Sequence, residues 1–144
     1  MEIKILTVGK IKDRAYLEKI EDYASRIKHD AKLEIVEIKD AGMEREGEKI
    51  IDHLKNARAR IVALDERGKA VTSVGFAQKL AAAGGPVVFV IGGPGGLSEA
   101  VKTAAHERLS LSAMTFTHEM ARLLLLEQIY RAISIIKNRK YHKE

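Results

Sequence analysis

The alternation of β-rich and helical segments constrains the fold of this chain more than any other feature. Each of five short β-rich runs is followed by a segment with helical spacing or with a helix cap. A strand that returns to the same sheet through a helix pairs in parallel with its neighbour. The pattern predicts an α/β fold with a mostly parallel sheet and helices on both faces. The strands are expected at residues 3–8, 33–38, 60–65, 87–91 and 109–114.

Capping residues and apolar spacing define the expected helices. A Ser, Thr or Asp side chain before the first turn can accept a hydrogen bond from a free backbone N–H. Residues 66–73, after the third strand, are expected to form a loop. The expected helices run from the Asp13 cap to about Lys28, over 44–57, from a Thr72 or Ser73 cap to Ala83, from the Ser98 cap to about Glu107, and from Thr117 to about Lys137.

Length and composition exclude several classes of protein. A chain of 144 residues with 46% hydrophobic residues is expected to form one domain, residues 1–144, with a proper core. The absence of cysteine excludes a disulfide framework and thiolate catalysis. Glu2 and Lys4 interrupt the first apolar stretch, so it does not resemble a signal peptide, and no apolar run is long enough to span a membrane. A cytoplasmic protein without membrane contact is expected.

The distribution of charge is compatible with a polyanionic partner. The formal net charge is +5, which fits either a nucleic-acid-binding protein or a protein that is merely basic. Charge alone does not separate these two interpretations. The basic residues gather in an early cluster (Lys10, Lys12, Arg14), a middle cluster (Arg58, Arg60, Arg67, Lys69) and a C-terminal cluster (Lys137, Arg139, Lys140, Lys143).

The last helix is apolar on nearly all sides. Apolar residues recur around it from Met120 to Ile136. Such a helix must be buried on nearly all sides, whereas a helix that covers a small sheet is buried on one side. A two-fold homodimer would cover the remaining surface and is favoured, the alternative being a central helix in a monomer. Glu127 and Arg131 are four residues apart on this helix and predict an intrahelical ion pair.

A glycine-rich turn, Gly92 to Gly96, follows the apolar run at 87–91. Glycine lets the backbone approach a ligand and adopt positive φ, although a strand-to-helix turn can also be glycine-rich for its own reasons. The spacing matches neither the dinucleotide fingerprint nor the P-loop. A neutral or cationic adenosyl ligand therefore fits better than one with phosphates. Ligands of parallel sheets bind at the carboxyl ends of strands, which directs attention to the turns after Asp65, Ile91 and Met114.

Other chemistry receives little support. Ser112 has no evident histidine and acid partner, which argues against a nucleophilic serine. The tail Tyr141-His142-Lys143 offers groups for stacking, proton transfer and phosphate contact, or is a disordered tail of mixed charge. No metal is expected, because no two histidines have HxxxH spacing. The five histidines are His29, His53, His106, His118 and His142.

Four motifs give the whole chain a resemblance to a known family. They are VGK (8–10), ALD (63–65), IGGPGGLS (91–98) and LSLSAMTFTHEMARLLLLEQIYRA (109–132), and the terminal YHKE adds to them. The chain resembles the ribosomal RNA large subunit methyltransferase H family, within the SPOUT superfamily. The resemblance implies a deep C-terminal trefoil knot and a homodimer. It also implies transfer of a methyl group from S-adenosylmethionine to N3 of a pseudouridine in helix 69 of 23S rRNA, on assembled ribosomes.

The resemblance also implies roles for particular residues. Glu127, Arg131, Tyr141 and His142 would lie at the catalytic, RNA-facing side. Lys143 stands where the family pattern usually has arginine, which retains the charge but loses the bidentate fork. Residues that would hold S-adenosylmethionine are Leu64, Gly92, Leu111, Ser112, Ala113, Met114, Thr115 and Phe116.

Two other functions remain as alternatives at this stage. A non-catalytic nucleotide-binding or RNA-binding module with this fold would keep the glycine turn and the basic surface. It would not need Glu127, Tyr141 or His142. An NAD-linked oxidoreductase would need a glycine fingerprint that the chain lacks.

Overall fold

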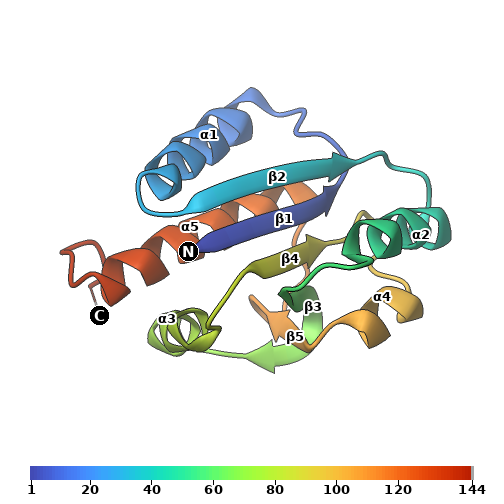
Figure 1. The fold of residues 1–144 in the computed structure, drawn as a ribbon. Coiled ribbons are helices and arrows are strands. Elements are labelled where there is room, and N and C mark those ends of the chain that lie inside the picture. The colour runs from blue at the N-terminus through green and yellow to red at the C-terminus, as the bar shows by residue number, and fades with distance from the viewer. Residues whose placement is uncertain (144) are drawn as a thin grey trace.

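The computed structural model describes residues 1–143 and shows a five-stranded sheet between two layers of helices (Figure 1). All strand pairs are parallel, in the order β2-β1-β4-β3-β5. Glu144, the last residue of the YHKE motif, lies outside the described residues. The elements are β1 (Glu2–Val8), α1 (Arg14–Lys28), β2 (Lys32–Ile38), α2 (Met43–Leu54), β3 (Arg60–Ala70), α3 (Ser73–Ala82), β4 (Val87–Ile91), α4 (Glu99–Ala104), β5 (Glu107–Ser110) and α5 (His118–Ile136).

Both faces of the sheet are buried, as the expected α/β fold requires. Every residue of β4 is buried, and its side chains alternate between two hydrophobic cores. Phe89 faces the core beneath α1, α3 and α5, whereas Val88 and Val90 face the core beneath α2 and α4. A central parallel strand is apolar on both sides for this reason. The predicted fold class is confirmed.

Helix α5 packs on the sheet between α1 and α3. Leu125, Leu126 and Ile129 are completely buried within the single chain. Flanking helices therefore account for much of the apolar circumference that the sequence displays. Ile136, at the end of α5, remains exposed. The homodimer stays a prediction, and so does the trefoil knot.

Four helix caps occur where the sequence predicts them. The side chains of Asp13, Thr72, Ser98 and Thr117 each accept a hydrogen bond from a backbone N–H in the first turn of α1, α3, α4 and α5. These bonds satisfy N–H groups that have no partner within the helix. No helix in residues 1–143 has the length and apolarity needed to cross a membrane.

Strand β3 is longer than predicted. The prediction of a loop over 66–73 is wrong for residues 66–70, which belong to the strand. The strand continues to Ala70 because Lys69 and Ala70 pair with β5 after a register shift that begins at Leu64. Long-range pairing of this kind leaves no local sequence signal. Three further predictions are wrong at their ends: β5 spans 107–110 rather than 109–114, α2 ends at Leu54 rather than at Ala57, and α4 ends at Ala104 rather than near Glu107.

Gly68 lies at the irregular part of β3, where two chain segments approach very closely. A Cβ atom at Gly68 would lie 2.7 Å from the backbone carbon and oxygen of Arg108, and 3.0 Å from the carbonyl oxygen of Asp65. Backbone atoms of a paired strand cannot move aside cheaply. Only glycine therefore permits β3 and β5 to pair on both sides of the register shift.

We predict that Gly68→Ala destabilises the protein by about 1–3 kcal/mol, the range of overpacking substitutions. Gly85→Ala is the matched control, because a Cβ there meets nothing within 4 Å and φ is not positive. The control is expected to stay within about 1 kcal/mol of wild type. Urea unfolding followed by circular dichroism measures both, and equal stability of the two variants would contradict the predicted clash.

Candidate functional site

A large open pocket lies at the carboxyl ends of three adjacent strands. Its volume is about 750 Å³, within the range of small-molecule sites. Residues 64–67, in the irregular middle of β3, and the loops that follow β4 and β5 form its walls, and His118 and Ala121 of α5 contribute to its lining. A parallel sheet places the carboxyl ends of its strands at one edge, so these loops converge although they are far apart in the chain.

Seven of the eight residues proposed to hold a cofactor line this pocket. The exception is Ala113, which is exposed and does not belong to the lining. Sequence reasoning missed Glu66, His118 and Ala121, which also line the pocket. Glu66 follows Asp65 directly and could have been found from its position at a strand end. The seven residues are Leu64, Gly92, Leu111, Ser112, Met114, Thr115 and Phe116.

The glycine-rich turn has structural reasons of its own. The Gly96 N–H donates to the Gly93 carbonyl oxygen at 2.9 Å, which closes a tight turn, and Gly96 has φ of 81°. A Cβ at Gly92 would lie 2.8 Å from the Gly96 backbone. At Gly93 it would lie 3.0 Å from Val8 and 3.2 Å from Glu46. These glycines are therefore required by the turn itself, which lines the pocket with backbone.

The segment from Leu111 to Phe116 is held in place by side-chain hydrogen bonds. Ser110 Oγ donates to the carbonyl oxygen of Ser112 at 2.8 Å and also contacts the carbonyl oxygen of Glu66 at 3.1 Å. The Met114 N–H donates to Ser112 Oγ at 3.0 Å. Thr115 Oγ1 donates to the Glu66 carboxylate. This loop is thereby fixed to Glu66 in the middle of β3 rather than left free.

Acidic side chains outnumber basic ones around the pocket. Its lining has four carboxylates, from Glu44, Asp65, Glu66 and Glu99, and two full cations, from Arg67 and Lys102. Such a surface attracts a cationic ligand and repels phosphate groups. Within residues 1–143, no three His, Cys, Asp or Glu side chains are arranged to hold a metal ion.

The four proposed catalytic residues form one hydrogen-bonded cluster at the other end of α5. Arg131 Nε donates to Glu127 Oε1 at 3.1 Å, and the Tyr141 hydroxyl donates to the same oxygen at 3.1 Å. Arg131 Nη1 lies 3.1 Å from His142 Nδ1. The predicted ion pair between Glu127 and Arg131 is confirmed, with side chains 17% and 23% exposed. Tyr141 and His142 of the tail pack against α1 and α5 through these contacts.

Residues of α1 and α5 that the sequence did not single out complete this cluster. The Tyr23 hydroxyl lies 3.0 Å from the Tyr141 hydroxyl, and the Tyr130 ring packs edge-on against the Tyr141 ring at 4.7 Å. Burial raises the pKa of Tyr141, and the hydrogen bond to Tyr23 and the charge of Glu127 raise it further. Tyr141 is therefore a neutral phenol at physiological pH and acts as a donor.

His142 faces a partner that can only donate. The guanidinium of Arg131 has no acceptor, so Nδ1 of His142 accepts and Nε2 carries the proton of the neutral ring. His142 Nε2 is buried without a hydrogen-bond partner among residues 1–143. The hydrogen bond and charge of Glu127 raise the pKa of Arg131, which keeps that guanidinium protonated.

Asp30, in the turn between α1 and β2, anchors the tail. Arg139 Nη1 and Nη2 each lie 2.7 Å from one oxygen of the Asp30 carboxylate, and Lys137 Nζ lies 3.2 Å away. Hydrogen bonds from Arg139 lower the pKa of Asp30 well below its usual range. This long-range contact has no sequence signature.

The two sites do not meet within one chain. His118 begins α5 at the pocket and Arg131 is thirteen residues further along. At 1.5 Å per residue these positions are separated by about 20 Å along the helix. His118 and Ala121 near the start of α5 line the pocket, whereas the tail leaves the far end of this helix, on the side of the chain's N-terminus (Figure 1). A reaction that needs both sites therefore needs a second chain or a large movement.

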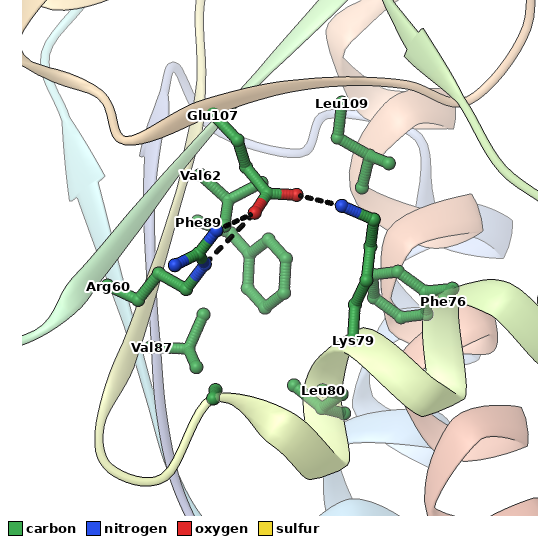
Figure 2. A pocket seen from close by; sticks show the side chains of 10 residues that line it. Arg60, Val62, Phe76, Lys79, Leu80, Val87, Phe89, Glu107 and Leu109 are labelled. Atoms are coloured by element: carbon green, nitrogen blue, oxygen red, sulfur yellow. Dashed lines mark hydrogen bonds and ion pairs between the residues drawn. The ribbon is translucent and has the colours of Figure 1, made fainter.

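A smaller cavity lies beneath an ion-pair network at the amino-terminal edge of the sheet. Glu107 accepts from Arg60 Nε at 2.9 Å and lies 3.3 Å from Lys79 Nζ, above the ring of Phe89 (Figure 2). Burial opposes the ionisation of Glu107, but both hydrogen bonds outweigh it and lower the pKa. The volume of about 20 Å³ has room for roughly one water molecule. This cavity is too small for a cofactor.

Comparison with known proteins relates the chain to one family. The family described as "Predicted SPOUT methyltransferase" matches residues 1–142. The protein named "Ribosomal RNA large subunit methyltransferase H" from Chromobacterium violaceum is 46% identical over 157 residues, with both chains fully covered. A protein of the same name from Bacillus pumilus is 41% identical over 160 residues, covering 99% of this chain and 100% of the relative.

Solved structures share the fold at low sequence identity. A probable methylase family protein from Haemophilus influenzae superimposes with a TM-score of 0.57 at 12% identity, covering 99% of this chain and 70% of that one. The SpoU methyltransferase AviRb from Streptomyces viridochromogenes, in complex with the cofactor AdoMet, gives 0.52 at 14% identity, covering 91% and 57%. These likenesses concern the fold alone.

We predict that Asp30→Asn frees the tail from α1. Trypsin should then cleave after Lys137, Arg139 or Lys140 faster than in wild type, because the bidentate ion pair is lost. Folding lowers the pKa of Asp30, so the ionised carboxylate stabilises the docked tail. This stabilisation is complete above the ordinary aspartate pKa of about 4 and is lost as the pH falls through the lowered pKa. Hydrogen exchange of the tail amides should be faster in Asp30→Asn than in wild type at the same neutral pH.

Exchanging the two charges in Asp30→Arg with Arg139→Asp should restore protection near neutral pH. Asp52→Asn is the control, because Asp52 pairs with Lys55 on the opposite layer of helices. Cleavage of the tail at the wild-type rate in Asp30→Asn would show that this ion pair does not hold it.

Proposed function

The chain belongs to the SPOUT methyltransferase family, and from this premise we propose that it methylates ribosomal RNA with S-adenosylmethionine as the methyl donor. The specific reaction is methylation at N3 of a pseudouridine in helix 69 of 23S rRNA, on assembled ribosomes in the cytoplasm. The observation that carries the proposal is the acidic pocket where the irregular middle of β3 meets the loops after β4 and β5.

S-adenosylmethionine suits the chemistry of this pocket. The donor is a cationic sulfonium without phosphate groups, and the lining has an excess of carboxylates. Leu64, Leu111 and Phe116 offer apolar surface to an adenine ring, and the turn at Gly92 offers backbone groups. AviRb, which shares the fold, has AdoMet as its cofactor. The cofactor supplies an electrophilic methyl group, so the protein's task is to position the acceptor.

Ribosomal RNA is proposed as the substrate on the names of relatives that match the full length of the chain. Residues 1–143 form one sheet with its helices and contain no second RNA-binding unit, so we assign specificity to the dimer surface and the shape of the ribosome. This is why an assembled ribosome, rather than free RNA, is the proposed substrate.

A homodimer with shared active sites resolves the separation of about 20 Å between the pocket and Arg131. The tail of one subunit, with Tyr141 and His142, completes the pocket of the other. At each site, one subunit then binds the cofactor and the other subunit supplies the catalytic tail. The trefoil knot belongs to the same proposal.

The N3 proton must leave before the nitrogen can attack the methyl group. His142 is the proposed acceptor and Glu127 the alternative. Both contact Arg131 in the isolated chain. When Arg131 turns to the base, Nδ1 of His142 loses that contact and can accept the N3 proton, while Glu127 stays bonded to Tyr141 and Gln128. The guanidinium stabilises the resulting anionic base, and its nitrogen takes the methyl group as the donor leaves as the neutral thioether. Tyr141 stacks on or orients the base, and Lys143 contacts a nearby phosphate.

A non-catalytic RNA-binding module is the second candidate. It would retain the pocket and the basic surface but would not need the cluster of Glu127, Arg131, Tyr141 and His142. Hydrogen bonds link all four of these side chains, which favours the enzyme.

We predict that Leu111→Arg abolishes cofactor binding, because it places a bulky cation in the pocket against the sulfonium. Isothermal titration of S-adenosylmethionine should show at least a hundredfold weaker binding than wild type. Leu17→Arg is the matched control at an exposed leucine of α1, 39% exposed and outside the pocket lining. Equal affinity of wild type and Leu111→Arg would contradict the assigned pocket.

We predict that mixed dimers reveal the shared site. His142→Ala should lower turnover by about 10²–10⁴-fold, as loss of a general base does, with S-adenosylmethionine affinity retained. A purified heterodimer of His142→Ala and Leu111→Arg has one pocket and one tail intact. It should recover about half of the wild-type activity on ribosomes. Activity no higher than that of either parent dimer would exclude a site built across subunits.

A further inference from the structure

We propose that the loop from Gly9 to Arg14 is a rigid contact surface for RNA phosphates beside the cofactor pocket. This inference rests on the proposed function and goes beyond it by assigning a substrate-binding surface. The surface consists of the three cations of the early cluster, Lys10, Lys12 and Arg14. It would grip the RNA backbone without reading its sequence.

Hydrogen bonds from two other elements hold the backbone of this loop. The Gly9 N–H donates to the carbonyl oxygen of Ile38 at 2.8 Å, at the end of β2. Glu119 Oε2, in the first turn of α5, accepts from the Lys12 N–H at 3.1 Å and the Asp13 N–H at 3.3 Å. The loop is therefore fixed at its start and near its end, and its cations lose little backbone freedom on binding.

A buried arginine ties the same loop to α5. Arg122 is 3% exposed, and its Nη2 donates to the Gly9 carbonyl oxygen at 3.0 Å while Nη1 donates to Glu37 at 2.8 Å. Such a guanidinium is costly to bury unless it is paired. The proposed mechanism gives Arg122 no role, whereas its contacts explain how the loop is held.

The loop lies directly beside the pocket. His118, one helical turn before Arg122, lines the pocket. A Cβ at Gly9 would lie 3.2 Å from His118 Nε2, and Gly9 has φ of 90°, so only glycine suits this position. A phosphate bound at Lys10 or Lys12 would therefore be close to the site of methyl transfer.

The cations of the loop are available to a ligand. Lys10, Lys12 and Arg14 are exposed and form no ion pair with residues 1–143. The nearby carboxylate of Asp13 accepts from N–H groups in the first turn of α1, and that of Glu119 accepts from the Lys12 and Asp13 N–H groups. Each carboxylate lies at a helix N-terminus, where the helix dipole offsets its charge.

The other two basic clusters are partly neutralised. Arg60 of the middle cluster pairs with Glu107, and Lys137 and Arg139 of the C-terminal cluster pair with Asp30. Only in the early cluster are all members free of ion pairs within residues 1–143. The early cluster is therefore the strongest candidate for a phosphate-binding surface.

The test compares two double variants that remove the same charge. Lys10→Gln with Lys12→Gln removes two proposed phosphate contacts. Lys4→Gln with Lys32→Gln removes two lysines that pair with Glu34 and Glu2 on strands β1 and β2. The probe is ribosomes from cells that lack the methyltransferase, used both in a binding assay at several salt concentrations and in a methyl-transfer assay.

We expect the loop variant to bind ribosomes at least tenfold more weakly than wild type at low salt. Its plot of log binding constant against log salt should be shallower by about 1.5, the effect of two lost contacts. The KM for ribosomes should rise, while kcat at saturation and the affinity for S-adenosylmethionine stay unchanged. The control variant should behave like wild type in all these measurements.

An unchanged salt slope, or equal weakening in both double variants, would overturn the phosphate surface while leaving the proposed function intact. The proposed function would instead be overturned if wild type binds ribosomes, and binds them more tightly than the loop variant does, but transfers no methyl group. Wild type that does not bind ribosomes would overturn the surface as well.

Discussion

Burial of α5 between α1 and α3 is the packing constraint on which both candidate sites depend. Its own Leu125, Leu126 and Ile129 are fully buried, which makes the helix a rigid spacer of fixed length. Its first turn lines the pocket and holds the Gly9–Arg14 loop, and its last turns carry Glu127 and Arg131. The separation between these ends is set by helical rise and not by side-chain adjustment. The proposed shared site across two subunits rests on this geometry.

The pocket illustrates how a parallel sheet gathers distant residues. The sequence predicted that the turns after Asp65, Ile91 and Met114 would bear the ligand, and all three regions line one pocket. The prediction depended only on strand order and on the general behaviour of strand ends. The glycine turn is different, because close contacts within the protein explain Gly92 and Gly93 without a ligand. Its composition alone was therefore weaker support than its position.

Local signals in the sequence were read correctly, whereas long-range contacts were not. Asp13, Thr72, Ser98 and Thr117 act as caps because a cap needs only its own first turn. The extension of β3 to Ala70 depends on pairing with β5, and the anchoring of the tail depends on Asp30, more than a hundred residues away. Neither is visible in a single sequence. The family resemblance supplied Tyr141 and His142, which spacing alone would have left in an unstructured tail.

The most direct test of the account is a methyl-transfer reaction on ribosomes from cells that lack this methyltransferase, followed by mass analysis of the digested nucleosides of 23S rRNA. The account predicts one additional methyl group, on N3 of a pseudouridine from helix 69, that depends on added S-adenosylmethionine. Methylation of a different nucleoside would contradict the proposed site, and no incorporation by a protein that binds S-adenosylmethionine would contradict the proposed reaction.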